Sequence, residues 1–475
     1  MSRFYVLNFG CRATQADGAA IERQFEQRGL DQAKSSSSAE WVVLNTCAVT
    51  AAAERDARAA IRRIKRHNPG CKIVITGCYA QRAPQEVAAL ADVSQVIGNS
   101  HKHNLAEIVL REQSEKDTCG SFFPLEGLRP VTRARAEDFG AEIFVSDIFA
   151  HTELLAAPVF DSANERTRPN LKVQDGCNNR CSFCIIPSVR GRSRSMHAAG
   201  VVQQVRELVD AGYREVVISG INLGRWGRDL ESNPVWGRAP HGPVFEDLVR
   251  AILDQTRLEK LRISSVEPMD WSDSLIRLVS ESARIAKHAH VPMQSGSDTV
   301  LRRMHRKYRP WHYREKIEKI RAAMPMGAIG ADVMVGFPGE SDAEFEETRR
   351  MIEELPFTYL HVFTFSARPG TPAATMEEQV PARIARERNQ ILRNLAAEKK
   401  LAFMRSFIGQ EVEAITLNVI SENSHGIWTE ALTDNYLKSR IRGKHAPNTW
   451  LSAKVEMVED GQLVAVARRK LSSCA

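Results

Sequence analysis

The chain has 475 residues, a length that exceeds one ordinary hydrophobic core and predicts two to four domains. Apolar residues make up 43% of the chain and charged residues 26%, which excludes a largely disordered protein. The formal net charge of +7 favours a polyanionic partner, because an excess of Lys and Arg attracts phosphate groups.

Targeting signals are not visible in the sequence. No long apolar stretch with a small-residue cleavage site follows the first residues, and no window approaches the run of about 18 apolar residues that spans a bilayer. We therefore expect a cytoplasmic protein without membrane contact. In this compartment the nine cysteines are expected to be metal ligands or catalytic thiols rather than disulfide partners.

Short apolar runs alternate with helical patterns over the first hundred residues. The apolar runs that predict strands cover residues 4–9, 41–45, 72–76 and 94–98. This alternation predicts a parallel sheet with right-handed crossovers. We therefore expect an N-terminal parallel-sheet βαβ domain over residues 1–111. Residues 112–169 show no sustained period and are interpreted as a linker with some local structure.

From residue 170 onward the alternation resumes on a larger scale. Strand patterns cover residues 171–175, 215–220, 261–267, 288–294, 329–337 and 360–365. Six β/α units of about 35 residues each are too few for a closed eight-stranded barrel but enough for a partial (β/α)6 barrel, which we assign to residues 170–395. Such folds place their chemistry on loops at the C-terminal ends of the strands.

The last part of the chain has a different pattern. A charged helix over residues 380–405 acts as a spacer, and alternating apolar and polar residues follow it. This pattern predicts a small antiparallel β module over residues 404–470.

A basic stretch lies within the predicted barrel. Residues 302–321, RRMHRKYRPWHYREKIEKIR, interleave Tyr308, Trp311 and Tyr313 with Lys and Arg. The mixture is typical of surfaces that contact phosphates and stack bases. A solvated amphipathic helix pair explains the same residues equally well, so both interpretations stay open.

Cys177, Cys181 and Cys184 follow the first barrel strand with the spacing C-x3-C-x2-C. A structural zinc ion needs a fourth ligand, for which a single downstream histidine, His197, is weak support. Three cysteines cannot pair evenly in disulfides. An iron–sulfur cluster fits better, because three thiolates on four irons leave one iron free to bind another ligand.

Cys11, Cys47 and Cys78 each follow one of the first three strands of the N-terminal sheet. They are far apart in sequence, but the C-terminal ends of parallel strands meet at one edge of a sheet. Free cysteines are often small buried apolar residues, yet three at successive strand ends are an improbable coincidence. We therefore predict a second three-cysteine iron–sulfur cluster with its own open iron.

The C-x3-C-x2-C loop after a strand resembles the radical S-adenosylmethionine (SAM) superfamily. The resemblance implies that the open iron binds SAM and that reduction cleaves SAM to a 5'-deoxyadenosyl radical, which makes Cys177, Cys181 and Cys184 catalytic. It also implies a set of SAM contacts on the loop and at the strand ends: Phe183, Gly220, Asn222, Glu267, Gln294 and Ser295.

Two three-cysteine sets and a C-terminal β module resemble the radical SAM methylthiotransferase family. The motifs that carry the resemblance are NTCAVT, GCYAQ, QDGCNNRCSFCIIPSVRGRSRS, QSGSD, DVMVGFPGE and ARPGTPAA. Residues 404–470 are similar to a TRAM domain, an RNA-binding β-barrel. GINLGRWGRD and HVFTFSARPGTPAA look most like the enzymes that act on N6-threonylcarbamoyladenosine at position 37 of tRNA.

This resemblance implies a reaction and its partners. Two 4Fe–4S clusters and two SAM molecules insert SCH3 at C2 of the adenosine, in a tRNA anticodon loop. A flavodoxin- or ferredoxin-type protein supplies single electrons, and we expect a monomer. The predicted RNA contacts are Arg302, Arg303, Arg306, Lys307, Tyr308, Lys438 and Arg440.

Three alternatives stay open. Relatives in the family act on isopentenyladenosine-37 of tRNA or on an aspartate of ribosomal protein S12. An iron–sulfur electron carrier would use both clusters without catalysis, although carriers shield their irons with four ligands. A purely RNA-binding protein would not need six placed cysteines.

Overall fold

The structure is a computed structural model that describes residues 2–117, 140–151, 154–155, 168–230, 244–423 and 426–468. It contains two compact units. The first unit comprises Met1–Val159, Leu171–Ser195 and Ser366–Ala374. The second unit comprises Phe160–Asn170, Met196–Phe365 and Thr375–Ala475.

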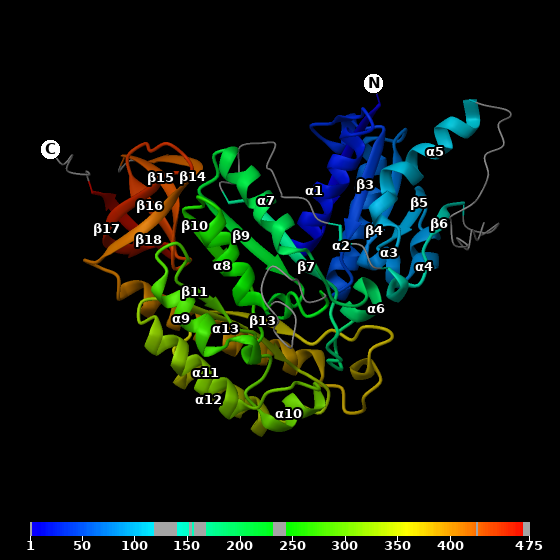
Figure 1. Ribbon diagram of the computed structural model, residues 1–475. Helices are drawn as coiled ribbons and strands as arrows, with labels where there is room; N and C mark the ends of the chain where they lie inside the picture. The colour runs from blue at the N-terminus through cyan, green and yellow to red at the C-terminus, as the bar shows by residue number, and fades with distance from the viewer. Residues whose placement is uncertain are drawn as a thin grey trace. The chain divides into compact units, whose positions relative to one another are not determined.

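The first unit is built on a six-stranded parallel sheet with the order β2-β1-β3-β4-β5-β6 (Figure 1). Its strands are β1 (Arg3–Asn8), β2 (Asp31–Gln32), β3 (Trp41–Thr46), β4 (Lys72–Gly77), β5 (Val93–Gly98) and β6 (Glu142–Phe144). The predicted parallel sheet is confirmed. Strand β6 lies inside the predicted linker 112–169, much of which falls outside the described residues, so part of that segment belongs to the sheet.

Helices cover both faces of this sheet. Helices α1 (Arg12–Glu26) and α5 (Leu105–Asp117) pack their apolar residues on one face, together with Phe4 and Trp41. The opposite face is covered by α2 (Ala51–His67), α3 (Cys78–Arg82) and α4 (Pro84–Ala88). Burial of apolar side chains on both faces explains why β3 is a continuous apolar run instead of an alternating one.

Residues 171–195 fold with the first unit. Strand β7 (Asn170–Asp175) pairs with the short antiparallel β8 (Arg194–Ser195), and helix α6 (Ile186–Arg190) lies between them in sequence. Ile185 and Val189, at this helix, are buried in the same apolar core as Val42 and Ile75 of the N-terminal sheet. The loop that carries C-x3-C-x2-C is therefore anchored in the N-terminal core.

The second unit contains the remaining barrel strands. These are β9 (Glu215–Gly220), β10 (Lys260–Ile263), β11 (His288–His290), β12 (Ala328–Val335) and β13 (Tyr359–Thr364). The ladders β9–β10 and β11–β12–β13 are parallel, and single bridges at Leu261 and Ser265 join β10 to the chain around β11. The predicted strand 288–294 ends early, because Pro292 has no backbone N–H and Gln294 has a positive φ of 64°.

Helices follow the strands in this unit. They are α7 (Ala198–Asp210), α8 (Phe245–Gln255), α9 (Asp273–Glu281), α10 (Asp298–Arg303), α11 (Pro310–Ala323), α12 (Asp342–Glu354) and α13 (Ala382–Arg405). Strand-helix alternation with parallel pairing confirms the predicted α/β fold class with its partial (β/α)6 barrel.

The C-terminal residues form a closed barrel with the order β14-β15-β16-β18-β17. Its strands are β14 (Glu411–Asn423), β15 (Gly426–Thr433), β16 (Lys438–Arg442), β17 (Trp450–Glu459) and β18 (Gln462–Ala467). The predicted small β-barrel is confirmed. Its pairings are antiparallel except for β16–β18, which is parallel. Met404 and Phe407, at the end of α13 and just after it, are buried in the barrel core.

Among the described residues, no helix combines the length and the apolar character that a bilayer-spanning segment requires.

Candidate functional site

Cys11, Cys47 and Cys78, here called the N-terminal triad, lie at the C-terminal ends of three neighbouring strands. Cys47 and Cys78 directly follow β3 and β4, and Cys11 lies between β1 and α1, immediately before the first residue of the helix. Strand β3 pairs in parallel with both β1 and β4, so the three strand ends meet at one edge of the sheet. The structure thus brings together the three residues that are separated in sequence.

The electrostatics of Cys47 show that the triad is close. Burial raises the pKa of Cys47, the neighbouring thiols of Cys78 and Cys11 raise it further, and the pKa reaches about 12. Three thiolates at this place repel one another, so they need a strongly positive partner to stay ionised. A bound iron–sulfur cluster supplies that charge, since thiolates are its ligands.

The sulfur atoms of the two triads are not arranged around a single ion. Within the described part of the chain, neither three-cysteine set has all its sulfurs within 4.8 Å of one another. Thiolates around one zinc ion with bonds of about 2.3 Å lie only about 3.8 Å apart. The arrangement therefore does not match a mononuclear zinc site.

Gly10 leaves space beside the N-terminal triad. Its φ is +105°, and a Cβ built on it would lie 2.7 Å from Cys47 Cβ and 3.0 Å from Cys47 Sγ. A side chain at this position would collide with the thiol and strain the backbone. The glycine of the motif NFGC is thus required by the position of Cys47.

Cys177, Cys181 and Cys184, here called the loop triad, lie on the loop between β7 and α6. The backbone N–H of Cys177 donates to Gly191 O (3.1 Å), and the N–H of Cys184 donates to Cys181 O (3.1 Å). The N–H of Asn179 lies 3.4 Å from Cys177 Sγ, the contact that stabilises a thiolate. All three thiols are partly exposed, so an exchangeable ligand can reach them.

Five buried charged side chains form one hydrogen-bonded network in the first unit. Arg190 donates to Asp175 Oδ1 (2.9 Å) and to Asp17 Oδ2 (2.9 Å), and Lys172 Nζ donates to Asp175 Oδ2 (2.8 Å) and to Asp17. Lys102 Nζ donates to Asp17 Oδ2 (3.0 Å). Each of the five residues is at most 6% exposed. We call Asp17, Lys102, Lys172, Asp175 and Arg190 the buried ion network.

The buried ion network carries more positive than negative groups. Burial raises the pKa of Asp17, but Arg190, Lys102 and Lys172 outweigh it and lower the pKa to about 2. Burial lowers the pKa of Arg190, but the two carboxylates and the thiols of Cys78 and Cys11 hold it well above its ordinary value. Arg190 is therefore ionised, and its positive charge interacts with the thiols of Cys78 and Cys11 in the N-terminal triad.

Helix α6 links the two triads. Asn99 Nδ2 donates to Val189 O (2.7 Å) and lies 3.6 Å from Cys78 Sγ. Arg190, the next residue, belongs to the buried ion network through its bond to Asp17. Gly191, which follows it, accepts the N–H of Cys177. Within the first unit, this short turn therefore contacts Cys177 directly and reaches Cys78 through Asn99.

The motif ARPGTPAA also belongs to the first unit. Arg368 is 3% exposed and donates to Glu54 of α2, which also accepts from Arg82 Nε (2.9 Å). The N–H of Ala373 donates to Ser182 O (2.9 Å), inside the loop of the loop triad. This segment is therefore hydrogen-bonded to the loop that carries the loop triad.

The predicted SAM contacts outside the cysteine loop lie in the second unit. Gly220 ends β9, Asn222 and Glu267 follow β9 and β10, and Gln294 and Ser295 follow β11. These strands are parallel neighbours, so their ends share one edge of the second unit. Phe183 lies in the first unit, next to Cys184.

Gln294 has the features of a ligand-binding residue. It is 8% exposed, has a left-handed φ of 64°, and its Oε1 has no hydrogen-bond partner among the described residues. Both the backbone strain and the unpaired oxygen are costly without a ligand. Ser295 Oγ lies 3.1 Å from Thr348 Oγ1, and Glu267 forms an ion pair with Arg306.

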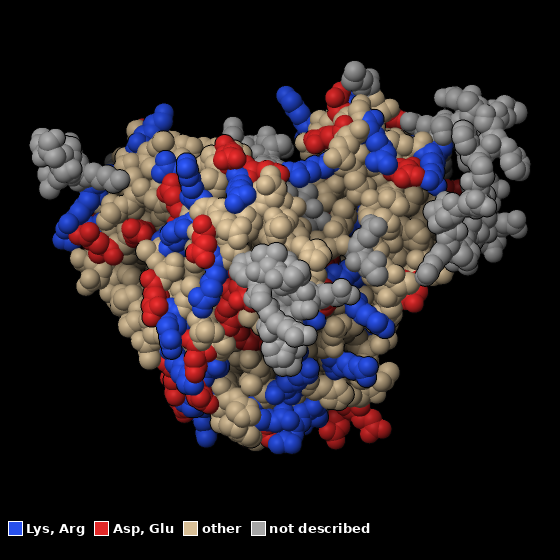
Figure 2. Space-filling model, in the orientation of Figure 1, with Lys and Arg blue, Asp and Glu red and all other residues tan. Residues whose placement is uncertain are grey.

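The predicted RNA contacts divide into exposed and buried residues. Arg302, Lys307 and Lys438 are exposed. Figure 2 shows Lys and Arg gathered near α10 and mixed with Asp and Glu over α11 and α12. Arg303 and Arg440 are partly buried and pair with Glu344 and Glu459.

The structure corrects the interpretation of Arg306 and Tyr308. Arg306 is 7% exposed and pairs with Glu267, and Tyr308 is 1% exposed and donates its hydroxyl to Met293 O (2.6 Å). Tyr313 is buried in the same way, whereas the Trp311 side chain is exposed. The aromatic residues of the stretch mostly face the core, because they occupy the apolar side of α11 and its preceding turn.

Known proteins share this arrangement of sequence and fold. A family model described as "Uncharacterized protein family UPF0004" matches residues 3–98, and one described as "Radical SAM superfamily" matches residues 171–352. The threonylcarbamoyladenosine tRNA methylthiotransferase MtaB of Bacillus subtilis (strain 168) is 35% identical over 91% of this chain and 89% of its own length. The chain belongs to the radical SAM methylthiotransferase family. It is a transferase that uses SAM and 4Fe–4S iron–sulfur chemistry.

Two further relatives and one solved structure are similar to this methylthiotransferase. The MtaB protein of Rickettsia prowazekii (strain Madrid E) is 34% identical over 97% of this chain and 96% of its own. A tRNA-2-methylthio-N(6)-dimethylallyladenosine synthase of Salinispora arenicola (strain CNS-205) is 33% identical over 87% of this chain and 76% of its own. The structure of the radical SAM methyltransferase TsrM from Kitasatospora setae shares the fold, with a TM-score of 0.53, 14% identity, and coverage of 78% of this chain and 75% of that one.

The sequence did not indicate the buried ion network. Lys172 and Asp175 stand in the strand LKVQD, and charges within a buried strand are a signal of buried pairing. Their partner Asp17 lies 155 positions away from Lys172, and Arg190 lies on a separate helix 15 positions after Asp175, so the pattern alone does not identify them.

The buried ion network yields a stability prediction. Arg190→Met leaves Asp17 and Asp175 short of a cation, and loss of one partner of a buried pair costs about 3–5 kcal/mol. We expect faster hydrogen–deuterium exchange in β3 and β4, measured by mass spectrometry. The control Arg383→Met removes an exposed ion pair on α13. It is expected to change the free energy of unfolding by less than about 0.5 kcal/mol and to leave the exchange rates in β3 and β4 nearly unchanged. Equal exchange in the two variants would contradict a structural role for Arg190.

Proposed function

We propose that this methylthiotransferase inserts SCH3 at C2 of N6-threonylcarbamoyladenosine at position 37 of tRNA, with two 4Fe–4S clusters and two SAM molecules. The observation that carries the proposal is the placement of both cysteine triads in one compact unit, where Asn99 bridges α6 to Cys78 and Gly191, just after α6, bonds to Cys177. Two relatives named MtaB, which are 34–35% identical over more than nine tenths of this chain, support the substrate.

Each triad has a role in this proposal. The loop triad holds the cluster at which SAM is cleaved to a radical, and the N-terminal triad holds the cluster that carries the sulfur. C2 of an adenosine has no useful acidity, so its hydrogen is removed by a radical rather than by a base. A donor of sulfur must then lie near the radical, and this requirement explains why two triads share one folded unit.

The second unit supplies further SAM contacts in the proposal. Gly220 and Asn222 lie near the SAM amino group, Glu267 lies near its ribose, and Gln294 and Ser295 complete the contacts of this unit. The unpaired Oε1 of Gln294 supports this assignment, because a bound donor satisfies it. Since Glu267 pairs with Arg306, the same arginine orients the carboxylate that meets the ribose.

The proposed RNA surface consists of exposed basic residues on two elements of the second unit. Arg302 and Lys307 lie on and just after α10, and Lys438 begins β16 of the barrel. Arg303 and Arg440 contribute if their pairs with Glu344 and Glu459 open. An anticodon loop presents unstacked bases and a dense phosphate charge, which such a surface attracts.

A second candidate substrate is isopentenyladenosine at the same tRNA position. The Salinispora synthase, whose name contains dimethylallyladenosine, is 33% identical, which lies within the 32–35% range of the MtaB relatives. Sequence identity therefore does not separate the two substrates, and a direct measurement is needed.

Nucleoside mass spectrometry of total tRNA separates the candidates. Cells that lack this chain are expected to lose the 2-methylthio form of threonylcarbamoyladenosine and to accumulate its unthiolated precursor. The wild-type gene restores it, and Cys181→Ser does not, because the loop triad then has too few ligands. Loss of the isopentenyl series alone, or a change only in ribosomal protein S12, would refute the proposed substrate.

Iron analysis tests the two-cluster assignment separately from the substrate. After anaerobic reconstitution we expect about eight irons per wild-type chain and about four in Gly10→Ala, whose new Cβ collides with Cys47. Gly29→Ala is the matched control, since Gly29 also has a positive φ of +79° but no atom within 4 Å of the position that the new methyl group takes. The Gly10→Ala protein should still cleave SAM. An unchanged iron content in Gly10→Ala would oppose a cluster at the N-terminal triad.

A further inference from the structure

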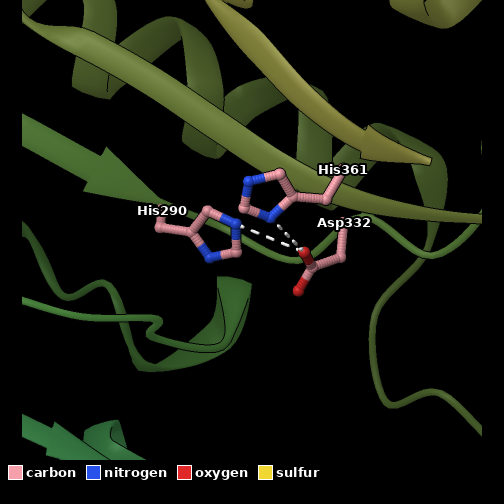
Figure 3. Close-up of side chains that lie close together, drawn as sticks. All are labelled: His290, Asp332 and His361. Carbon is pink, nitrogen blue, oxygen red and sulfur yellow. Dashed lines mark hydrogen bonds and ion pairs between the residues drawn. The ribbon is translucent and has the colours of Figure 1, made fainter. Parts of the chain in front are cut away.

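His290, Asp332 and His361 lie side by side on the adjacent strands β11, β12 and β13 of the second unit. In the parallel register, His290 pairs with Gly330 and Asp332 pairs with His361. Figure 3 shows a ring nitrogen of each imidazole facing the same oxygen of the Asp332 carboxylate. No step of the proposed methylthiolation uses these three side chains.

The distances among the three donor atoms match those around one metal ion. Asp332 Oδ1 lies 3.4 Å from His290 Nε2 and 3.3 Å from His361 Nδ1. One ligand atom from each of the three side chains lies within 4.8 Å of the other two. A tetrahedral ion with bonds of about 2.0–2.1 Å places its ligands about 3.3–3.4 Å apart.

Hydrogen bonding within the group does not account for His290. His361 Nδ1 forms a hydrogen bond with Asp332, whereas the contact of His290 Nε2 with the same oxygen, at 3.4 Å, is an ion pair and not a hydrogen bond. His290 is only 8% exposed, so this nitrogen is shielded from water as well. A buried ring nitrogen without a hydrogen bond is costly, and a metal ion removes that cost.

The surroundings hold the imidazoles in place. The ring of Tyr359 lies 6.0 Å from that of His290 and 5.3 Å from that of His361, between centroids. Gly330 leaves the space for Tyr359, because a Cβ built on it would lie 2.0 Å from Tyr359 Cζ. Tyr359 is itself fixed by its hydroxyl contact of 2.7 Å with His288 Nε2. Ligands fixed in this way lose little freedom when an ion binds.

We propose that His290, Asp332 and His361 bind one divalent transition-metal ion of the zinc or ferrous-iron class, separate from the iron–sulfur clusters. Two imidazoles and one carboxylate are ligands that these ions prefer. Three protein ligands leave at least one coordination position for water or an anionic oxygen ligand. The His361 side chain is 63% exposed, so the position is reachable from solvent.

The site is tested on the full chain with its iron–sulfur clusters reconstituted anaerobically. Equilibrium dialysis against low-micromolar zinc, followed by elemental analysis, is expected to find about one zinc per chain in addition to an unchanged iron content. Constant iron shows that zinc has not displaced iron from the cysteines. The zinc and iron contents do not depend on methylthiotransferase activity. Failure of the zinc site is therefore distinguishable from failure of the proposed function.

Two ligand variants and one control locate the ion. His361→Gln and Asp332→Asn are expected to weaken zinc binding by more than about 100-fold, since even loss of an outer-sphere partner costs about 10–100-fold. His312→Gln, at an exposed histidine of α11, should bind zinc like the wild type. His361 is largely exposed, so its variant should fold normally. Absence of zinc from the wild-type chain, or unchanged binding in both ligand variants, would overturn the proposal.

Discussion

The pairing of Asp17 with Arg190 is the constraint on which the first unit depends. Asp17 belongs to α1 and Arg190 to α6. The two residues are 173 positions apart in sequence, and both side chains are almost fully buried. Charges in such a place are tolerated only when each has partners, and Lys102, Lys172 and Asp175 supply the rest. The N-terminal sheet and the C-x3-C-x2-C loop are thereby joined by ionic contacts as well as by a shared apolar core.

This arrangement also sets the electrostatics around the cysteines. Burial lowers the pKa of Lys102, but the two carboxylates hold the pKa of Arg190 well above its ordinary value, so Arg190 keeps its positive charge beside the N-terminal triad. Thiolates are the form that binds iron, and a nearby positive charge favours that form. The same residues therefore serve the packing of the unit and the chemistry of its ligands, since Arg190 interacts with Cys78 and Cys11 as well as with Asp17.

Much of the fold could be predicted because the pattern of apolar residues is local. The strand patterns around Trp41 and Lys72 nearly match β3 and β4, and the positions of Cys47 and Cys78 follow directly from them. Features that depend on distant partners could not be predicted. Composition marked residues 302–321 as basic and aromatic, but only the fold shows that Tyr308 faces inward.

The His290, Asp332 and His361 group was hidden for a similar reason. Each residue stands alone in its own strand, and only the register of β11, β12 and β13 makes them neighbours. A histidine or aspartate inside an apolar strand is the available signal, but it does not say which strands pair. Strand β6 escaped prediction because three residues are too few to show a period.

The segment Ser366–Ala374 has a consequence for how the protein is made. Glu54 pairs with Arg368 across 314 positions of sequence, so the first unit gains its last internal contacts only after most of the chain has left the ribosome. Contacts between such distant positions form slowly, because a long loop must close first. The first unit therefore cannot complete these contacts until residues 366–374 have been synthesised.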